Sequence, residues 1–562
     1  MSVAATRPWL AAYAPGVPAD LPAPELSAIG QFRAAARRGP DAPAVHYFAR
    51  TISYGELDGL SSAMAAAMAE LGVRPGDRVA LYLQNVPQFW VAQLAAWKLG
   101  AVVVPLNPMF KAQELEYHLC DSGAVALVTH EGLYADVARQ VVPDTPAVHV
   151  ITTSELDLLG DGPRPAPLAG AERRRLGETW DMLELCARHA GAADPAAPVA
   201  PADSAYLTYT SGTTGRPKGA MNTHANVAHN AEVYRVWMDL SARDVVVGAA
   251  PLFHITGAIA HLAAAALVGA PVILGYRFDA GALLSLIERW RGTFLMASIT
   301  VYNALMHHPE IGARDLGSLT KCFSGGAPIA PALVERFQAL TGAYIHNLYG
   351  LTETTSPSHA VPLGARAPVD AASGALSVGL PVPGAVVRVV DEAGQEVPAG
   401  TVGELWTSGP MVVPGYWRRP EDSERAVGGG WLRTGDVGWM DPAGWFFIVD
   451  RKKDMIIASG FKVWPREVED VLYQHPAVRE AAVIGVPDDY RGETVKAYVS
   501  LKGGAAADPG ELIGFCRERL AAYKCPRQLA ILPELPKTAT GKLLRRRLRE
   551  LHAAEAALAA AD

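Results

Sequence analysis

The chain has 562 residues, of which 50% are hydrophobic and 19% are charged, and its formal net charge is −7. This length exceeds what one hydrophobic core sustains, so we expect two or more domains. The mildly acidic balance argues against nucleic-acid binding and against broad electrostatic attraction to anionic membranes. The five cysteines lack metal-ligand and Cys-x-x-Cys spacing, which argues against a disulfide framework and favours a reducing, cytoplasmic setting.

Neither the N-terminus nor the most apolar stretch has the features of a membrane segment. Residues 1–16 lack the charged segment and apolar run of a signal peptide. Residues 257–270 are apolar, but they carry His261 and fall short of the roughly 20 residues that span a bilayer. They predict a buried helix, and we expect no integral membrane segment. The Pro- and Ala-rich residues up to Leu26 indicate a lightly ordered lead-in.

After this lead-in, buried strands alternate with amphipathic helices. Strands are expected at residues 78–83, 101–106 and 124–129, and helices at residues 87–99 and 111–120. Strand, helix and strand at short spacing predict parallel βαβ units whose helices cover the faces of a sheet.

A second α/β series begins after a loose Pro-, Ala- and Gly-rich stretch at residues 160–203. The pattern predicts further strands at residues 245–250, 271–274, 294–297 and 321–324, and helices at residues 279–290 and 331–340. Beyond Ser377 the pattern becomes β, with strands at residues 386–390 and 403–407. A smaller α+β unit begins near Asp454, with a helix at residues 466–474 and strands at residues 481–486 and 495–501.

Charge runs are most often solvated surfaces. We interpret the basic runs at residues 173–175 and 545–547 in that way.

The most informative stretch is residues 209–219, Tyr-Thr-Ser-Gly-Thr-Thr-Gly-Arg-Pro-Lys-Gly. Glycines let backbone N–H groups approach an anion, hydroxyls donate to phosphate oxygens, and Lys218 supplies a mobile positive charge. A solvated turn has a similar composition, and the common nucleotide P-loop has a different spacing that leads into a helix. The chemistry favours a triphosphate cradle built from Thr210, Ser211, Gly212, Thr213, Thr214 and Gly215.

A second stretch, residues 349–354, combines three groups that suit a bound nucleotide. The ring of Tyr349 can stack on adenine. Thr352 can donate to the α-phosphate, and Glu353 offers the hard oxygen ligand that Mg²⁺ prefers. The alternative is a strand end followed by a polar turn.

Several shorter stretches are individually less specific. Gly325 and Gly326 follow a predicted strand and would let a purine pack flat against the backbone. Asp436 lies on a Gly turn and is a carboxylate of the kind that accepts ribose hydroxyls. His254, in residues 251–257, has the common alternative of a buried histidine with satisfied hydrogen bonds.

All of these motifs occur once, and together they resemble the motifs of the adenylate-forming superfamily, which includes the acyl-CoA synthetases. The match at residues 209–219 is almost letter for letter, and the ordered motifs span roughly residues 45–547. The resemblance implies an α/β fold with a large N-terminal domain of mixed and parallel sheets, flanking helices and a β-rich subdomain. It also implies a small mobile α+β C-terminal domain, giving domains at residues 1–452 and 453–562 with a hinge near Lys453.

The resemblance also implies roles for individual residues. Adenine or the acyl chain would lie near Gly325, Gly326 and Ala327, and the nucleotide near Tyr349 and Gly350, with Tyr349 stacked on adenine. The ribose would lie near Asp436 and Arg451. Catalytic roles would fall to Lys542, which would bridge the carboxylate and the α-phosphate, and to Glu353, Thr352, Lys218 and His254. His254 would border the acyl pocket and the pantetheine channel. Gly460 would let the pantetheine arm pass close to the backbone, and Lys462 would meet CoA phosphates.

The implied reaction is that of an acyl-CoA synthetase with ATP, Mg²⁺ and coenzyme A. The substrate carboxylate attacks the α-phosphorus of ATP and releases pyrophosphate; CoA thiolate then attacks the acyl-adenylate, and AMP leaves. Lys542, Lys218 and Mg²⁺ on Glu353 would stabilise the developing charge. The small domain would swing about Lys453, removing Lys542 and presenting Gly460.

The acid and the acceptor are less clearly indicated. Residues 251–257 contain no carboxylate to pair with a substrate ammonium, which argues against amino acids, and the apolar residues 258–260 favour a fatty or other hydrophobic acid. Residues 298–302 lack the proline that acyl-CoA synthetases commonly have before the threonine, which leaves the shape of the acyl pocket open. An aromatic or bulky natural-product acid also stays open.

Three rival functions remain. An acyl carrier protein could replace CoA as acceptor, and a luciferase-like oxygenase belongs to the same superfamily. A non-catalytic nucleotide-binding regulator is the rival from another class, but the intact Lys542, Glu353 and Asp436 argue against it. The sequence leaves the oligomeric state open.

Overall fold

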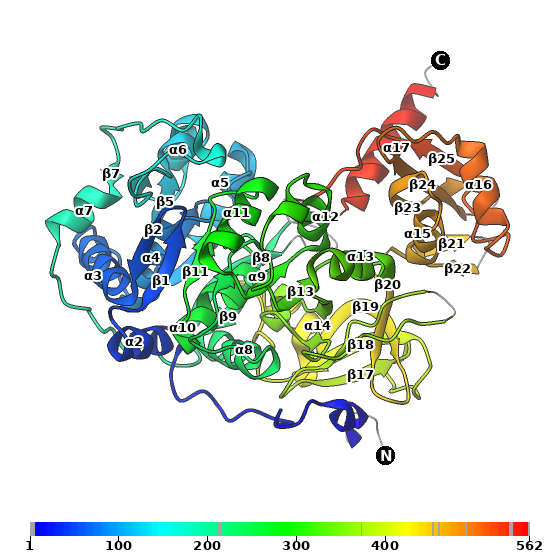
Figure 1. Ribbon diagram of the computed structural model, residues 1–562, viewed down its shortest axis with the longest axis horizontal. Coiled ribbons are helices and arrows are strands. Elements are labelled where there is room, and N and C mark those ends of the chain that lie inside the picture. Colours follow the sequence, from blue (N-terminus) through cyan, green and yellow to red (C-terminus); the bar gives the residue numbers. More distant parts are fainter. Residues whose placement is uncertain are drawn as a thin grey trace.

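The structure is a computed structural model that describes residues 6–210, 216–371, 374–451, 454–458, 461–488, 492–538 and 543–559 (Figure 1). The side chains of residues 451, 461, 462, 492 and 556–559 are also outside the description.

The first large sheet has the order β7-β6-β5-β3-β4-β8-β9 and is parallel except for its last strand. Successive residues of a strand point to opposite faces. In β3, Val79 and Leu81 join one core and Ala80 and Tyr82 join another. Helices therefore cover both faces, as the βαβ pattern predicts. The elements are β3 (Arg78–Tyr82), α4 (Pro87–Lys98), β4 (Val102–Pro105), α5 (Ala112–Ser122), β5 (Ala126–His130), β6 (His149–Thr153), β7 (Trp180–Asp181), β8 (Ser204–Thr210) and β9 (Lys218–Thr223).

The second large sheet has the order β16-β15-β14-β13-β12-β10-β11-β1-β2, with a parallel centre and antiparallel edges. Its strands are β1 (Pro43–Tyr47), β2 (Arg50–Ser53), β10 (Val246–Val247), β11 (Val272–Leu274), β12 (Phe294–Ala297), β13 (Lys321–Gly325), β14 (Ile345–Tyr349), β15 (His359–Ala360) and β16 (Leu380–Pro381). Helices along it include α2 (Ala28–Arg38), α3 (Tyr54–Glu70), α8 (His224–Trp237), α11 (Ala280–Trp290), α12 (Ile299–His307) and α13 (Pro331–Thr341).

One strand of this sheet is shorter than predicted. The apolar run at residues 245–250 forms only the two residues of β10. The side chain of Asn85 donates to the carbonyl oxygens of Gly248 and Ala250, at 3.0 Å each. The Asn85 side chain thus occupies backbone carbonyl oxygens that would accept hydrogen bonds from neighbouring strands if β10 were longer.

The apolar residues 257–270 form a buried helix, as predicted. Its parts are α9 (Ile255–Gly257), the π-helical η5 (Ala258–Ala263) and α10 (Ala264–Val268). His261 lies inside it, and its Nε2 accepts a hydrogen bond from the Ala250 backbone N–H at 3.1 Å. Among the described residues, none of the helices combines the length and apolar character needed to cross a bilayer.

The β-rich region predicted beyond Ser377 is a four-stranded antiparallel sheet, β17 (Val386–Val390), β18 (Gly403–Ser408), β19 (Leu432–Met440) and β20 (Phe446–Arg451). The predicted fold class is confirmed in this sheet and in the two large ones.

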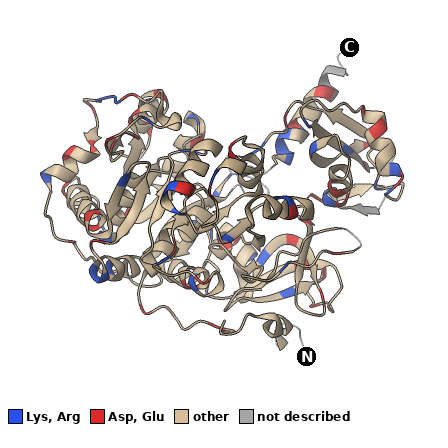
Figure 2. Ribbon diagram, viewed as in Figure 1, with Lys and Arg blue, Asp and Glu red and all other residues tan. Residues whose placement is uncertain are grey.

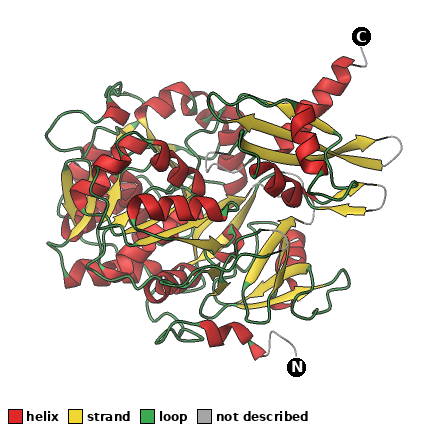
Figure 3. Ribbon diagram, turned by 45° about the vertical axis from the view of Figure 1, so that its right-hand side comes forward, coloured by secondary structure: helices red, strands yellow, loops and turns green. Residues whose placement is uncertain are grey.

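A separate small sheet follows at one end of the molecule (Figure 1). It contains β21 (Ile456–Ala458), β22 (Phe461–Val463), β23 (Val478–Asp488), β24 (Gly492–Leu501) and β25 (Gln528–Ile531). Helices α15 (Pro465–Tyr473) and α16 (Pro509–Arg517) share a core with one face, and α17 (Arg545–Ala559) packs on the other (Figure 3).

The expected lightly ordered lead-in is wrong for its first part. The short helix η1 (Pro8–Ala12) carries Trp9, which is fully buried. Trp9 packs against the edge of Phe446, and a side chain at Gly444 would lie 2.4 Å from the Trp9 Cα. Contacts with a segment more than 400 residues away therefore order the lead-in, and composition does not record them.

Acidic and basic residues are interspersed along the ribbon, as Figure 2 shows. The mixture of both signs along the ribbon fits the small net charge of −7.

Candidate functional site

The predicted phosphate loop joins two paired strands. Thr210 ends β8, Lys218 begins β9, and the two residues are partners in an antiparallel ladder. The hairpin therefore fixes both ends of the predicted loop. Five of its predicted phosphate-binding residues lie outside the described residues: Ser211, Gly212, Thr213, Thr214 and Gly215.

Lys218 is held by an acidic residue from a distant segment. Its Nζ lies 2.7 Å from Asp422 Oδ1, in the first turn of α14 (Pro420–Val427). The hydrogen bond from Lys218 lowers the pKa of the Asp422 carboxyl. The same ammonium lies 5.6 Å from the centre of the Tyr416 ring. The side chains of Asp422 and Tyr416 thus fix the position of the Lys218 ammonium, the predicted phosphate-binding cation.

The predicted magnesium ligand lies next to the same hairpin. Glu353 is in the turn η7 (Thr352–Thr354), which follows β14. Its Oε1 accepts a hydrogen bond from the Tyr416 hydroxyl at 2.7 Å. On β9, the Asn222 amide donates to the Thr352 carbonyl oxygen at 2.9 Å. The structure therefore brings the turn with Thr352 and Glu353 against the strand that begins with Lys218.

Two predicted nucleotide contacts are bonded directly to each other. The Tyr349 hydroxyl donates to Asp436 Oδ2 at 2.7 Å. Asp436 lies in β19, 5% exposed, and its partner residue on β20 is Arg451. Residues assigned to adenine and to ribose therefore lie together at the junction between β14 and the β-rich sheet.

The glycines predicted to receive a purine also have a packing reason. A side chain at Gly325 would lie 2.6 Å from the Leu348 carbonyl oxygen on β14. Gly326 has a φ of +83°, which favours glycine. Ala327 follows in the turn after β13, and at Gly350 an added carbon would lie 3.0 Å from the Pro357 Cα. Close backbone packing accounts for glycine at positions 325 and 350, so their contact with a ligand stays a prediction.

His254 precedes the buried helix at residues 255–268. Its Nδ1 accepts a 3.3 Å hydrogen bond from the Thr256 backbone N–H, which makes it the N-cap of α9. Its role beside an acyl group stays a prediction.

Two family models together match most of the chain. The AMP-binding enzyme model matches residues 32–417, and the model of the AMP-binding enzyme C-terminal domain matches residues 467–542. A long-chain-fatty-acid–CoA ligase of Bacillus subtilis (strain 168) is 36% identical over 97% of this chain and 98% of its own length. A feruloyl-CoA synthase of an Amycolatopsis species is 37% identical over 92% of this chain and 96% of its own.

The chain belongs to the AMP-binding enzyme family.

The fold comparison agrees with this assignment. The crystal structure of the anthranilate CoA ligase AuaEII with anthranoyl-AMP matches this AMP-binding enzyme with a TM-score of 0.83 and 29% identity, covering 96% of this chain and 99% of the other. The predicted superfamily is confirmed. So is the enzyme class, an ATP-dependent, AMP-forming carboxylic acid–CoA ligase that uses ATP and CoA.

Magnesium fits the donor set through one carboxylate. The described residues contain no group of three or more His, Cys, Asp or Glu side chains that could hold a metal ion by themselves. Mg²⁺ typically binds one or two carboxylates together with substrate phosphates and waters. Glu353, beside the hairpin with Lys218, suits an ion that arrives with the nucleotide.

Several predicted site residues of this AMP-binding enzyme are not tested by its structure. Lys542, Lys453 and Gly460 lie outside the described residues, and only the backbone of Arg451 and Lys462 is described. Their roles stay predictions.

The structure adds site residues that the sequence motifs did not indicate. Tyr416 and Asp422 hold Glu353 and Lys218, and Asn222 joins β9 to the turn of Glu353. Asp121 accepts from the Tyr209 hydroxyl at 2.7 Å and from Arg419 at 2.5 Å. The only local sequence signal for these residues is the Pro-Gly-Tyr-Trp run at residues 414–417, in which Pro-Gly predicts a turn followed by two aromatic residues.

The interpretation of residues 545–547 as solvated is wrong for Arg545. Its guanidinium donates to Glu469 Oε1 at 2.8 Å and lies 3.1 Å from Asp450 Oδ1 and 3.3 Å from Asp454 Oδ2. Burial lowers the pKa of Arg545, but the neighbouring carboxylates raise it by more than burial lowers it. The guanidinium therefore stays charged. The exposed Arg546 and Arg547 agree with the prediction.

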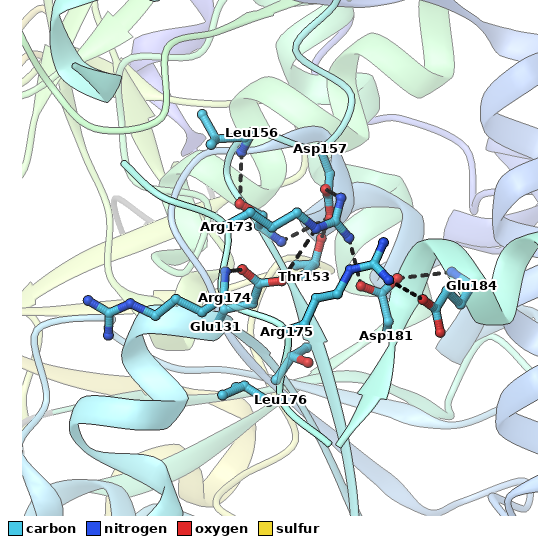
Figure 4. Close-up of polar contacts among 12 residues, drawn as sticks. Glu131, Thr153, Leu156, Asp157, Arg173, Arg174, Arg175, Leu176, Asp181 and Glu184 are labelled. Carbon is cyan, nitrogen blue, oxygen red and sulfur yellow. Dashed lines mark hydrogen bonds and ion pairs between the residues drawn. The ribbon is translucent and has the colours of Figure 1, made fainter. Parts of the chain in front are cut away.

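The basic run at residues 173–175 is likewise only partly solvated (Figure 4). Arg173 lies 2.6 Å from Asp157 Oδ1 and 2.7 Å from Asp181 Oδ2, and its Nε is 3.7 Å from Glu131. Asp157 has a fully buried side chain, and burial raises the pKa of its carboxyl. Arg175, 81% exposed, fits the prediction. Buried acids from other elements decide which arginine of the run is drawn inward.

Replacing Arg173 with Leu is expected to lower the free energy of unfolding by about 2 kcal/mol. Removing one partner of a buried ion pair leaves the other charge uncompensated, and the partial exposure of Arg173 keeps the effect below the value for a fully buried pair. Urea unfolding followed by circular dichroism measures the change. The matched control is Arg175→Leu, expected to change stability by less than about 0.5 kcal/mol. Equal midpoints for the two variants would contradict a structural role for Arg173.

Proposed function

We propose that this enzyme activates a fatty acid, or another hydrophobic carboxylic acid, as the acyl-adenylate and transfers the acyl group to CoA. The observation that carries the proposal is the placement of Lys218, Glu353 and Asp436 around the β8–β9 hairpin and the β14 turn. A cation, a hard oxygen ligand and a ribose-type carboxylate are the groups that a magnesium nucleotide requires. The near full-length match to a long-chain-fatty-acid–CoA ligase supports the substrate class.

The first half-reaction needs charge stabilisation rather than a base, because the attacking carboxylate is already ionised. The loop residues 210–215 and Lys218 hold the β- and γ-phosphates, and Lys542 bridges the substrate carboxylate and the α-phosphate. Glu353 would hold Mg²⁺, which would supply positive charge that stabilises the departing pyrophosphate. Such preorganised charge acts on the developing negative charge without reorganisation at the moment of reaction.

Binding and transfer use the remaining predicted residues. Tyr349 stacks on adenine next to Gly350, while adenine or the acyl chain lies near Gly325, Gly326 and Ala327. Asp436 and Arg451 hold the ribose. Thr352 donates to the α-phosphate. His254 borders the acyl group and the pantetheine arm, Gly460 lines the arm's path, and Lys462 meets the CoA phosphates.

The chain is divided into residues 1–452 and 453–562, with a hinge at Lys453. The division is supported by the separate sheet β21–β25 and by the interval between the two family matches, which end at residue 417 and begin again at residue 467. The small domain swings about Lys453 between the two half-reactions, so that one site performs both. The reducing setting indicated by the cysteines supports a cytoplasmic location.

An aromatic acid is the second candidate, because a feruloyl-CoA synthase is 37% identical. The anthranilate CoA ligase likewise shares the fold with a TM-score of 0.83. Residues 298–302, which lack the proline common in acyl-CoA synthetases, lie at the start of α12. There the Ser298 and Thr300 hydroxyls are hydrogen bonded to each other at 2.6 Å.

The test measures CoA-dependent pyrophosphate release from Mg²⁺ and ATP with acetate, octanoate, palmitate, benzoate and cinnamate, followed by the product mass. We expect the highest kcat/KM with octanoate or palmitate, and a product heavier than CoA by the acyl group. A preference for benzoate or cinnamate would favour the aromatic candidate. Pyrophosphate release without acyl-CoA formation would favour a carrier protein as acceptor. Failure of every acid to give AMP would overturn the proposal.

A further inference from the structure

Residues 413–423 form a segment that runs from the β-rich sheet along the hairpin of Lys218. The Met221 N–H donates to the Gly415 carbonyl oxygen at 3.0 Å, and the Trp417 N–H donates to the Gly219 carbonyl oxygen at 2.8 Å. Ala220 and Tyr416 are partners in an antiparallel bridge. The segment is thus hydrogen bonded to the first residues of β9, like a short additional strand.

The same segment is also bonded to the turn of Glu353. The Val413 N–H donates to the Glu353 carbonyl oxygen at 3.0 Å, and the Tyr416 hydroxyl donates to the Glu353 carboxylate at 2.7 Å. The Tyr416 hydroxyl is the donor in this contact, so it restrains the orientation of the Glu353 carboxylate.

The far end of the segment reaches Lys218. Asp422 contacts Lys218 at 2.7 Å, and Arg425 contacts the same carboxylate at 2.8 Å. The Tyr416 ring lies between the two ends of this arrangement, with its hydroxyl on Glu353 and its face 5.6 Å from the Lys218 ammonium. An aromatic face attracts a cation. One ring therefore contacts both charged groups.

We propose that Tyr416 and Asp422 are positioning residues: Tyr416 orients the Glu353 carboxylate for a nucleotide-bound divalent cation, and Asp422 holds Lys218 toward the phosphates. The inference rests on the proposed function, since it requires Lys218 and Glu353 to face a magnesium nucleotide. A carboxylate with one oxygen fixed by a hydroxyl has fewer orientations to lose when a cation binds. Because one backbone segment bears both residues, it sets the spacing between the two charged groups.

The two residues are expected to affect nucleotide binding in different ways. Tyr416→Phe removes one oxygen atom and keeps the ring, so it should weaken only the part of ATP binding that Mg²⁺ adds, by about tenfold, as for a lost hydrogen bond to a charged group. Asp422→Asn releases Lys218 from its place. It should weaken ATP binding about fivefold with and without Mg²⁺, because the lysine contacts phosphate directly.

Titration calorimetry of the full chain with ATP, in the presence and absence of Mg²⁺, tests these expectations without any acid substrate. The matched control is Tyr47→Phe, on strand β1 of the second sheet. It removes a buried hydroxyl that donates to the Glu155 carbonyl oxygen at 2.8 Å. It should leave both affinities unchanged. Thermal unfolding of each variant shows whether it is folded.

A double-mutant cycle separates positioning from general packing. In the Glu353→Gln background, Tyr416→Phe should cause no further loss of the Mg²⁺ increment, because the group it orients has lost its charge. Additive losses, or a Mg²⁺ increment in Tyr416→Phe equal to that of the unmodified enzyme, would overturn the assignment of Tyr416. If Tyr416→Phe does not fold, Asp422→Asn decides, and an unchanged ATP affinity overturns the inference. Failure of the unmodified enzyme to bind magnesium ATP would instead count against the proposed function.

Discussion

Replacing Lys542 with Ala is expected to stop adenylate formation while leaving thioester formation largely intact. If the lysine bridges the substrate carboxylate and the α-phosphate, its charge is needed only while negative charge builds up around phosphorus. Removing one such preorganised charge or donor costs about 10²–10³-fold in rate. The second half-reaction should change by less than about threefold on this scale, because the proposed swing of the small domain removes Lys542.

Two assays measure the two half-reactions of this variant separately. ATP–pyrophosphate exchange reports adenylation, and acyl-CoA formation from supplied acyl-adenylate reports transfer. Lys537→Ala is the control, because Lys537 belongs to the same C-terminal stretch but forms an ion pair with Glu480 at 2.6 Å. Its two rates should stay near those of the unmodified enzyme. Equal losses of both half-reactions in Lys542→Ala would contradict the swing about Lys453.

Local patterns predicted most of the strands and helices because those elements depend on their own residues. The expected strands at residues 294–297 and 386–390 are β12 and β17, with the same bounds. The expected helix at residues 279–290 is α11, with Asp279 as its N-cap. Alternating burial and capping are recorded within a few residues of sequence.

The misjudged features depend instead on partners far along the chain. Trp9 is ordered by Gly444 and Phe446, the strand at Val246 is cut short by Asn85, and Arg173 is drawn inward by acids of other elements. A local sequence pattern predicts that a charge run is solvated, because it contains no information on buried carboxylates that come from distant parts of the chain. The site follows the same division: the motifs gave Glu353 and Lys218, but Tyr416 and Asp422 are adjacent to them only in the folded chain.

Replacing Arg545 with Met is expected to destabilise the small C-terminal unit by about 3–5 kcal/mol, the range for breaking a buried ion pair from one side. The side chains of Asp450, Asp454 and Glu469 are 3%, 8% and 6% exposed, and all three contact this guanidinium. Arg549 continues to hold Asp454 at 2.8 Å, so Asp450 and Glu469 bear the loss.

The defect should depend on pH in a defined direction. Burial raises the pKa of Glu469, and Arg545 opposes this rise. Without the arginine, the folded-state pKa lies further above the unfolded one, so protonation favours the folded state as the pH falls. The difference in thermal midpoint between the variant and the unmodified enzyme should therefore be larger at pH 8 than at pH 5. The control Arg547→Met loses only an exposed pair with Glu550 and should change stability by less than about 0.5 kcal/mol at both values.

The same arginine connects stability to the reaction. Arg545 begins α17 three residues after Lys542, and it binds Asp450 and Asp454 on either side of residue 453. Its carboxylate partners therefore flank the proposed hinge, while its own helix follows the proposed catalytic lysine. In Arg545→Met, adenylation should fall more than thioester formation, because only adenylation requires Lys542 at a fixed place. A folded variant that loses both rates equally would mean that the arginine supports the small unit without positioning the lysine.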